Sequence, residues 1–311
     1  MTPIDLRFGG YQGPASVHTR AGNVFGEALA DALGNCVNFT FDANIVERGR
    51  KASDLLAMVE TGEIDGCYFS SSYLAERIAE LGIFDQHFVV TDREKAYAVL
   101  DGPLGKRLAG LVEAGTGYVI LDYWDNGFRH ISTGRHPIRR AEDCKGLKIR
   151  TLANENHQRV FRSLGFEPRA IDVRDLPAAV ADGTVDAQEN PLTNIYNFKL
   201  HTTHKYITLT RHLMGVALVL FNKERVRSWP VDFRSGVERA LRQATRSQRR
   251  FAEEEDRICA KKLIAEGAEI FELDAVQRET FVAATRAEVA KIRAGFDADL
   301  IALFDKNLYH T

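Results

Sequence analysis

The sequence predicts an α/β protein of two domains joined by crossing strands, and three observations indicate this fold class. The 311 residues exceed what a single hydrophobic core usually organises. Strand-like and helix-like patterns alternate from residue 4 onward. A long amphipathic helical pattern then covers residues 233–267.

The first 70 residues predict a parallel sheet covered by helices. Amphipathic helical patterns alternate with short apolar runs, and the two helical patterns end near Gly34 and Gly62, which can take left-handed C-cap conformations. Such β-α-β-α-β alternation is typical of parallel strands linked by helical crossovers. We expect strands at 4–10, 37–43 and 63–70, and helices at 18–34 and 50–62.

A second segment repeats part of this pattern. Residues 176–191 (LPAAVADGTVDAQENP) align with residues 55–70 (LLAMVETGEIDGCYFS), so that Gly183 meets Gly62 and Asp186 meets Asp65. In both segments a helical pattern ends at a glycine and a short strand follows. The similarity predicts two similarly wound α/β domains, each presenting the end of an equivalent strand.

The C-terminal part predicts helices only. Residues 233–267 are followed by helical patterns at 274–297 and 298–307. A helix of about 30 residues runs ~45 Å, long enough to lie across two domains. No Pro- or Gly-rich linker is present, which favours crossing strands over a flexible tether. The expected division is residues 1–123 plus 213–252 for domain I, and residues 124–212 plus 253–311 for domain II.

Composition excludes several classes of protein. Lysine and arginine number 41 against 43 aspartate and glutamate residues, a formal charge of −2, so no strong field favours nucleic acid. Apolar runs such as MGVALVLF (214–221) are too short to span a bilayer, and we expect no membrane-embedded segment. MTPIDLRFGG reads as the entry to a strand rather than as a leader, which leaves two interpretations, a cytoplasmic protein or one whose leader has been removed.

Motifs for catalysis and cofactors are missing from the sequence. It contains no GxxxxGK[ST], GxGxxG, HExxH or GxSxG pattern. His201 and His204 could share one helix face, but no third ligand lies near them in the sequence. Four scattered cysteines show no metal-ligand spacing, and their disulfide state stays open: Cys36, Cys67, Cys144 and Cys259. We therefore expect no metal or other cofactor, and binding rather than catalysis.

Three polar groups lie where we expect strands to end, the place where open α/β sheets bind ligands. The first, in LDYWDNGFRHIS (121–132), includes Trp124 and Arg129; the second is Arg150 with Asn154; the third is Gln188, Glu189 and Asn190 before Pro191. Arginine offers two parallel donors to a carboxylate, and asparagine adds another. The alternatives are that Arg150 lies in water on an edge strand, that Glu189 pairs with an arginine, and that Asn190 caps a turn.

These segments carry a family resemblance. NGFRHIS (126–132), RHPIRRAEDCKGLKIRT (135–151) and GTVDAQENPLTNI (183–195) resemble segments of the DctP-type solute-binding receptors of tripartite ATP-independent periplasmic (TRAP) transporters. GPASVHTRAGNVFGEAL (13–29) is a weaker match, in which Ser16 and His18 stand as in family members. The resemblance covers essentially the whole chain. This sequence departs from the family at Ala187, where members usually have glycine, and at Asp175, where they usually have glutamate.

The resemblance implies a two-domain fold of the periplasmic-binding-protein type II class, with a cleft that closes by a hinge on a small organic acid. It implies a periplasmic location and two partners, the small and large membrane subunits of the transporter. Arg150 would form the salt bridge to the ligand carboxylate, Arg129 would line the same pocket, and Asn190 would hydrogen-bond the carboxylate. Asn154 would be a further pocket residue. We expect the empty cleft to be open, with Arg150 hydrated.

Aromatic residues suggest the ligand class. The strand end GCYFSSSYL (66–74) contributes Phe69, Ser70 and Tyr73 to the expected cleft, and Tyr11 and Trp124 reach it from other segments. Alternation sends about half of such residues into the core, so several of these aromatic side chains pack instead. We expect a small monocarboxylate with an apolar or aromatic body, such as a 2-keto or 2-hydroxy acid. A dicarboxylate stays an alternative ligand, because its second carboxylate would need a second cationic partner and Arg129 offers one. A sugar acid would need many polar partners for its hydroxyl groups.

An enzyme or a ligand-sensing regulator on the same two-domain fold is the alternative function. An enzyme would need a nucleophile, base or metal at the cleft, and the sequence offers no such set. A regulator would need a DNA-binding helix-turn-helix at one terminus. We therefore expect a receptor.

Overall fold

The computed structural model describes residues 2–309, which form two compact units. Unit 1 consists of Met1–Ser70, Lys106–Asp125 and Val216–Glu254. Unit 2 consists of Ser71–Gly105, Asn126–Gly215 and Glu255–Thr311. The domain division expected from the sequence stays a prediction, and it differs from these units mainly in placing residues 71–105 in the first domain.

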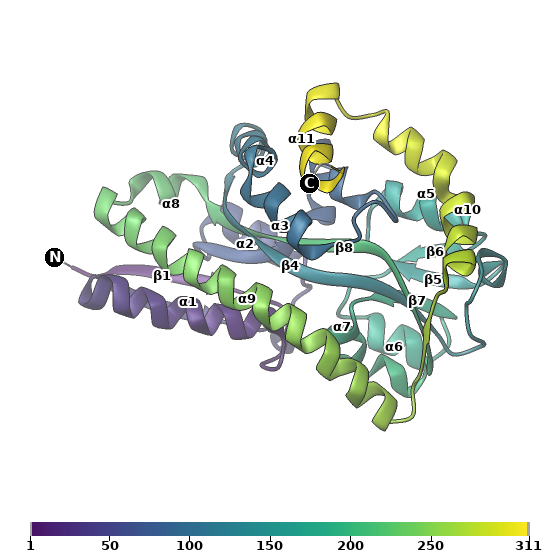
Figure 1. Ribbon diagram of the computed structural model, residues 1–311. Coiled ribbons are helices and arrows are strands. Elements are labelled where there is room, and N and C mark those ends of the chain that lie inside the picture. Colours follow the sequence, from purple (N-terminus) through teal and green to yellow (C-terminus); the bar gives the residue numbers. More distant parts are fainter. Residues whose placement is uncertain (1, 310–311) are drawn as a thin grey trace. The chain divides into compact units, whose positions relative to one another are not determined.

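Three long elements contribute to both units (Figure 1). Strand β4 (Tyr118–Thr133) passes from unit 1 to unit 2 after Asp125, and β8 (Tyr206–Asn222) returns to unit 1 after Gly215. Helix α9 (Val231–Ala265) begins in unit 1 and continues into unit 2 after Glu254. Crossing strands were expected from the lack of a linker, and a long helix across both domains from the amphipathic pattern over residues 233–267.

The sheet of unit 1 contains β1 (Ile4–Gly9), β2 (Val37–Asp42) and β3 (Gly66–Ser70), with the C-terminal part of β8 beside β3. Strand β1 pairs in parallel with both β2 and β3, because helices connect these three strands. Strand β3 pairs antiparallel with β8 from Gly66 opposite Phe221 to Ser70 opposite Ala217. The alternation in the first 70 residues therefore predicted these strands in the right order.

Helices of unit 1 pack an aromatic core onto this sheet. Ser16 caps helix α1 by accepting a hydrogen bond from the Thr19 amide through its side chain. The ring of Phe8 on β1 lies 5.6 Å from that of Phe25 on α1 and 5.8 Å from that of Phe221 on β8. Besides α9, the helices are α1 (Val17–Leu33), α2 (Asp54–Thr61), α4 (Pro103–Gly115, whose first residues belong to unit 2) and α8 (Lys223–Ser228).

The sheet of unit 2 places β5 (Lys148–Thr151) between β7 (Ala187–Asn190) and β6 (Glu167–Ala170). Strand β5 is parallel to both neighbours, and β7 pairs antiparallel with the C-terminal part of β4. Strand β9 (Glu269–Glu272) pairs in parallel with the start of β8. Since β6 ends the strand order, β5 is an internal strand.

Helices cover both faces of this sheet (Figure 1). One buried cluster packs Ile149 and Ile131 of the sheet against Phe161 of α5 and Phe281 of α10. A second cluster packs residues of α6, α7 and the end of α9 against β8. The helices of unit 2 are α3 (Arg93–Asp101), α5 (Glu155–Ser163), α6 (Leu176–Ala181), α7 (Leu192–Asn197), α10 (Ala275–Arg293) and α11 (Ala298–Tyr309).

The two similar segments adopt similar local structures. Helix α2 ends at Gly62 with φ +79°, and Gly183 follows α6 with φ +75°. Strands β3 and β7 come next in the chain, as the alignment predicted. The expectation that a strand ends within residues 121–132 is wrong, because β4 continues through Thr133. Gly127 takes φ +77° within that strand, so glycine accommodates the polar segment without ending it.

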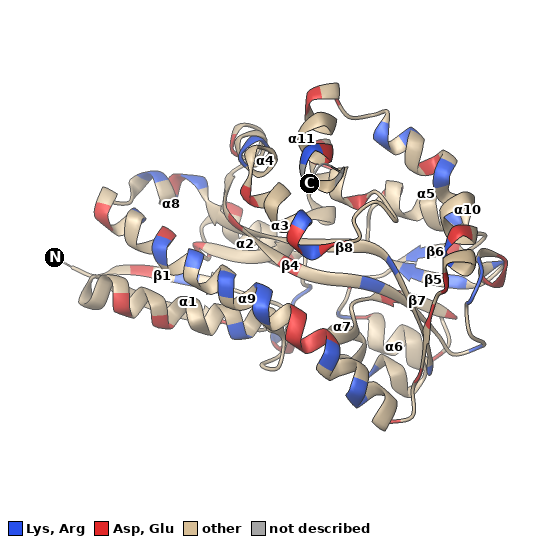
Figure 2. Cartoon of the chain, viewed as in Figure 1, with Lys and Arg blue, Asp and Glu red and all other residues tan. Residues whose placement is uncertain are grey.

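Charged residues of both signs are interspersed along α9 and over the other helices (Figure 2). This distribution agrees with the formal charge of −2. Within residues 2–309, no helix has both the length and the apolar character that crossing a membrane requires.

Candidate functional site

Arg150 is buried within unit 2. It lies on the internal strand β5, where only 1% of the residue is exposed. The edge-strand interpretation is therefore wrong, and so is the expectation that the Arg150 side chain is hydrated. Its neighbours Ile149 and Thr151 are fully buried as well, because helices cover both faces of this sheet.

The guanidinium of Arg150 is only partly satisfied. Its Nε donates a 2.8 Å hydrogen bond to the carbonyl of Ile171. Its Nη2 is buried and has no hydrogen-bond partner among the described residues, and no carboxylate there forms an ion pair with it. A buried cation without a counter-ion is costly, so this guanidinium is suited to receive an anion.

Arg129 on β4 is buried too, but its charge is compensated. Its Nε and Nη2 donate to the two carboxylate oxygens of Glu189 on β7, and Nη2 also donates to the Glu189 carbonyl at 2.7 Å. Burial alone would raise the pKa of Glu189, but Arg129 and two histidines hold that pKa well below its usual range. Pairing of Glu189 with an arginine is thus the alternative that the structure confirms.

Asn190 belongs to a hydrogen-bonded chain of side chains. Its Oδ1 accepts from Nη2 of Arg129 and Nδ2 of Asn194, both at 3.2–3.3 Å. Its Nδ2 donates to Oε1 of Gln188 at 2.6 Å, and Gln188 in turn donates to Oγ of Ser132. Asn190 does not cap the turn at Pro191, because α7 has no side-chain cap. The chain fixes the orientation of the Asn190 amide.

Asn154 has a structural role in unit 2. Its Oδ1 accepts from the His157 amide and so caps α5, the helix start expected there. Its Nδ2 donates both hydrogens, to the Ser72 carbonyl at 3.1 Å and to Oδ2 of Asp85 at 3.0 Å. Because these bonds use both donors of the amide, Asn154 keeps none for a ligand.

Three buried histidines cluster at Glu189, namely His87, His157 and His212, and no pattern in the sequence indicated this cluster. Nε2 of His157 and Nε2 of His212 each lie 3.3 Å from a Glu189 oxygen. The ring of His87 stacks on that of His212 at 5.4 Å. Burial lowers the pKa of His212 to about 4 and that of His87 well below its usual value, so both rings are neutral near pH 7. These histidines are far apart in the sequence, so sequence patterns could not predict that they cluster.

The remaining expected residues divide between the two units. Tyr11, Phe69 and Trp124 form an aromatic cluster in unit 1 with Tyr68, and all are at most 9% exposed. Trp124 is completely buried, and its Nε1 donates to Oγ1 of Thr245 at 3.0 Å, which indicates a packing role.

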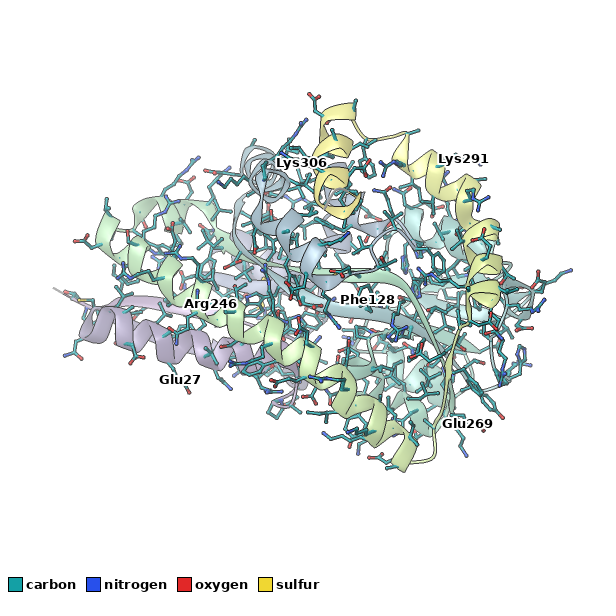
Figure 3. The ribbon with its side chains drawn as sticks, viewed as in Figure 1. Glu27, Phe128, Arg246, Glu269, Lys291 and Lys306 are labelled. Carbon is teal, nitrogen blue, oxygen red and sulfur yellow. The ribbon has the colours of Figure 1, made fainter. Side chains whose placement is uncertain are left out.

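Ser70 ends β3 in unit 1, whereas Tyr73 follows in a short 3-10 helix of unit 2 (Ser71–Tyr73). Phe128, labelled on β4 in Figure 3, is 6% exposed, and the guanidinium of Arg93 lies 5.2 Å from the centre of its ring. The structure therefore brings together Arg129 and Asn190 in unit 2 and Tyr11, Phe69 and Trp124 in unit 1.

The described part of the chain contains no metal-ion site and no disulfide bond. Within residues 2–309, no three His, Cys, Asp or Glu side chains are grouped closely enough to hold a metal ion. All four cysteines are free thiols: Cys36, Cys67, Cys144 and Cys259.

Comparison with known proteins identifies the family. Residues 15–295 match the family model DctP, described as bacterial extracellular solute-binding protein, family 7. The chain belongs to this family. The solute-binding protein of Verminephrobacter eiseniae is 32% identical over 239 residues, which are 77% of this chain and 69% of that protein. The C4-dicarboxylate-binding periplasmic protein DctP of Rhodobacter capsulatus is 30% identical over 65% of this chain and 60% of its own length.

A solved structure of the DctP family has the same fold. The sugar acid binding protein DctPAm of Advenella mimigardefordensis, in complex with galactonate, superposes with a TM-score of 0.93. It is 26% identical and covers 99% of this chain and 98% of its own. The predicted fold class and the predicted function, a periplasmic TRAP receptor for an organic acid that works with the membrane permease, are confirmed. The enzyme or regulator alternative is not favoured.

Proposed function

We propose that this DctP-family receptor captures its organic acid through the guanidinium of Arg150, which pairs with the ligand carboxylate. The single observation that carries the proposal is the state of this side chain. It is 1% exposed, its Nη2 is buried without a partner, and no carboxylate of the described residues pairs with it. A carboxylate would supply the missing charge and accept from the planar fork of the guanidinium.

Because the charge of Arg129 is already compensated, a ligand with one carboxylate fits better than a ligand with two. Arg129 and Glu189 already form a buried bidentate pair, so the two charges compensate each other within unit 2. A second ligand carboxylate near this pair would meet Glu189 as well as Arg129, and like charges repel strongly when they are desolvated. We therefore infer a ligand with one carboxylate, and Arg129 and Asn190 act as the rigid polar frame beside it.

The relatives support the carboxylate but differ in the rest of the ligand. The Advenella protein binds galactonate, and the Rhodobacter protein is named for C4-dicarboxylates. Both ligands carry a carboxylate, the group that Arg150 would bind here. An aromatic or apolar body, as expected from the sequence, has weaker support, because Trp124 packs into the core of unit 1.

Native mass spectrometry of the purified protein tests the proposal directly. We expect wild-type protein to carry a small carboxylic acid, and the Arg150→Ala variant to have lost it. Arg169→Ala is the matched control, because Arg169 is the register partner of Arg150 on β6 and its side chain is 53% exposed. Equal retention of the acid by the Arg150→Ala and Arg169→Ala variants would refute the role of Arg150.

A further inference from the structure

Helix α9 carries a row of arginines on the exposed side of its unit 1 part. Arg239, Arg242, Arg246 and Arg250 are all exposed, and all precede Glu254, where unit 1 ends. Their spacing of three, four and four residues places them on one face of an α-helix. At 1.5 Å per residue they extend over about 16 Å. We call these four residues the arginine stripe; Figure 3 labels Arg246.

The guanidiniums of the arginine stripe have no ionic partner within the chain. Among residues 2–309, no carboxylate forms an ion pair with any of the four. Arg250 lies 5.8 Å from the ring centre of Phe251, which carries no charge. By contrast, Arg234 of the same helix pairs with Glu238 at 3.0 Å. The charges of the stripe are therefore free to meet an external partner.

The arginine stripe carries charge of one sign only. Its consecutive members are three or four residues apart, the spacing at which like charges repel each other on a helix. No acidic residue lies between Arg239 and Arg250 in the sequence, and the acidic run at 253–256 begins after the stripe (Figure 2). Surfaces that only keep a protein soluble mix both signs, whereas a surface of one sign attracts an oppositely charged partner.

The residue type indicates which groups the partner presents. All four members of the stripe are arginine, and none is lysine. A planar guanidinium donates two parallel hydrogen bonds to a carboxylate or a phosphate, whereas an ammonium group acts as a point charge. A row of guanidiniums on one helix therefore fits a surface that presents several such anionic groups. The surroundings of the stripe decide between a protein and a lipid surface.

The stripe lacks the apolar side chains that a lipid surface would require. A helix that lies on a bilayer buries a face with large apolar residues beside its basic residues. Between residues 239 and 250, the exposed positions carry only arginine and Gln243, and no large hydrophobic side chain is exposed there. Val237 and Leu241, from the apolar face of α9, are buried. These surroundings favour a protein partner that presents carboxylates.

We propose that the arginine stripe of α9 docks this receptor onto a carboxylate-bearing face of the membrane subunits of its transporter. The receptor works with a membrane permease, so the two proteins must come into contact for the acid to be delivered. Complementary charges speed the encounter of two proteins, and like charges oppose it. The inference does not depend on Arg150, because the stripe belongs to unit 1 and Arg150 to unit 2.

Binding to the reconstituted membrane subunits tests the proposal. The probe is the small and large subunits together in nanodiscs of phosphatidylcholine, a lipid without net charge. We expect Arg242→Glu/Arg246→Glu to raise the Kd at least about tenfold, mainly through slower association. Lys51→Glu/Lys306→Glu is the matched control, because both lysines are exposed and the net charge changes equally. The control should change the Kd by less than about threefold. Equal effects of the two variants would overturn the inference.

Chemical protection of wild-type protein gives a second test, which does not depend on how a variant folds. Phenylglyoxal modifies accessible arginines, and mass spectrometry locates the modified residues. With the nanodiscs that contain the membrane subunits, modification of Arg242 and Arg246 should fall severalfold, because an interface excludes solvent. Arg169, whose side chain is 53% exposed in unit 2, is the reference and should react as before. No decrease at the stripe, or an equal decrease at Arg169, would overturn the docking surface.

Two further measurements examine other occupants of the stripe. Liposomes with phosphatidylglycerol but without membrane subunits should bind wild-type protein and Arg242→Glu/Arg246→Glu equally. Tighter binding of wild-type protein would assign the stripe to an anionic lipid surface and overturn the inference. Sedimentation should give the same oligomeric state for both proteins. A dimer present only in wild-type protein would assign the stripe to a second copy of the chain, which overturns the inference as well.

The docking surface and the carboxylate site can be separated in one pair of variants. Arg242→Glu/Arg246→Glu should keep the wild-type affinity for the acid found in the purified protein, because these residues are exposed on α9. If acid binding is kept but affinity for the membrane subunits is also unchanged, the docking surface is wrong and the proposed function stands. If Arg150→Ala keeps the acid while the stripe variant loses docking, the proposed function is wrong and the docking surface stands.

Discussion

Arg150 and Arg169 are register partners on neighbouring parallel strands, yet one is buried and the other lies in solvent. Arg150 is 1% exposed on the internal strand β5, whereas the Arg169 side chain is 53% exposed on β6, the last strand of the order. Arg169 donates hydrogen bonds to Glu167 and to the carbonyl of Pro168. The two arginines therefore lie in different dielectric environments although their strands are neighbours. Only the buried Arg150 is suited to bind an anion strongly.

Removing the Arg150 guanidinium should weaken ligand binding severely. Truncation of one partner of a buried charge pair costs about 2–5 kcal/mol, or roughly 30- to several-thousand-fold in affinity. Calorimetric titration of the Arg150→Ala variant with the acid identified in wild-type protein measures this loss. Arg169→Ala should change the affinity by less than about threefold, since exposed charges contribute little. A loss below about threefold for Arg150→Ala would remove this residue from the site.

In the absence of ligand, replacing Arg150 should not destabilise the protein. Its buried charge has no ionic partner among the described residues, so an apolar chain of similar length, as in Arg150→Met, relieves an electrostatic cost. We expect the free energy of unfolding in urea to stay equal or to rise. A decrease of more than about 2 kcal/mol would indicate that Arg150 stabilises the fold through contacts other than its hydrogen bond to Ile171.

Glu189→Gln should destabilise unit 2, because it leaves Arg129 buried without its counter-ion. Breaking a buried ion pair in this way costs about 3–5 kcal/mol. Glu272→Gln is the matched control, since Glu272 also pairs with an arginine, Arg211, but at a site where both side chains are about half exposed. The control should change the free energy of unfolding by at most about 1 kcal/mol. Similar effects of the two substitutions would contradict the compensating role of Glu189.

Acidification should destabilise the protein through its buried histidines. Burial lowers the pKa of His18, His204 and His212 to about 4, below the ordinary 6.5. Their stabilising contribution is complete above pH 6.5 and is lost as the pH falls towards 4, because the unfolded chain binds these protons first. The raised pKa of Asp85, about 6, acts in the opposite direction over part of this range, but three histidines outweigh one carboxyl group.

His212→Gln isolates one of these contributions. Each histidine adds up to about 1.4 kcal/mol per pH unit to the slope of unfolding free energy against pH. Urea titrations between pH 7.5 and 4.5 should therefore give a shallower slope for His212→Gln than for wild type. Gln243→Leu, at an exposed position of α9, should keep the wild-type slope. An unchanged slope in His212→Gln would show that His212 is charged in the folded protein.

A methyl group at Gly127 should be poorly tolerated. Gly127 has φ +77°, and a Cβ built there would lie 2.7 Å from Cβ of Pro191. Gly183 has nearly the same φ, +75°, but no atom within 4 Å of a built Cβ. Gly183→Ala should cost about 1–2 kcal/mol from backbone strain alone, and Gly127→Ala at least about 1 kcal/mol more from the clash. Equal losses of unfolding free energy would show that Pro191 moves aside.

The local elements could be predicted because their causes are local. Expected strands and helices of the first 70 residues agree with β1 to β3, α1 and α2 to within a few residues at their ends. The glycines at positions 62 and 183 take positive φ as the C-terminal signals required. The strand end predicted near Trp124 failed, because a polar segment between apolar halves also occurs where a long strand passes from one unit to the other.

The residues of the proposed site are only partly visible in the sequence. Strand alternation and family resemblance led to Arg150, Arg129 and Asn190, whose residue types suit a carboxylate. Asn154 was predicted for the same reason, but its amide is used by Ser72 and Asp85. Such use of a side chain depends on residues about 70 or 80 positions away, and no local pattern records it.

The sequence by itself determined the α/β class, the elements and the receptor family, because periodicity, glycine signals and contiguous motifs are properties of short segments. Only the tertiary structure decided which charges are compensated. Arg129 and Arg150 are both arginines on buried strands, and long-range packing gives one a carboxylate partner while leaving the other without one. Tertiary packing likewise brought together Gln12 and His18 with Tyr68 and Trp124, because burial and pairing arise from contacts between segments far apart in the chain.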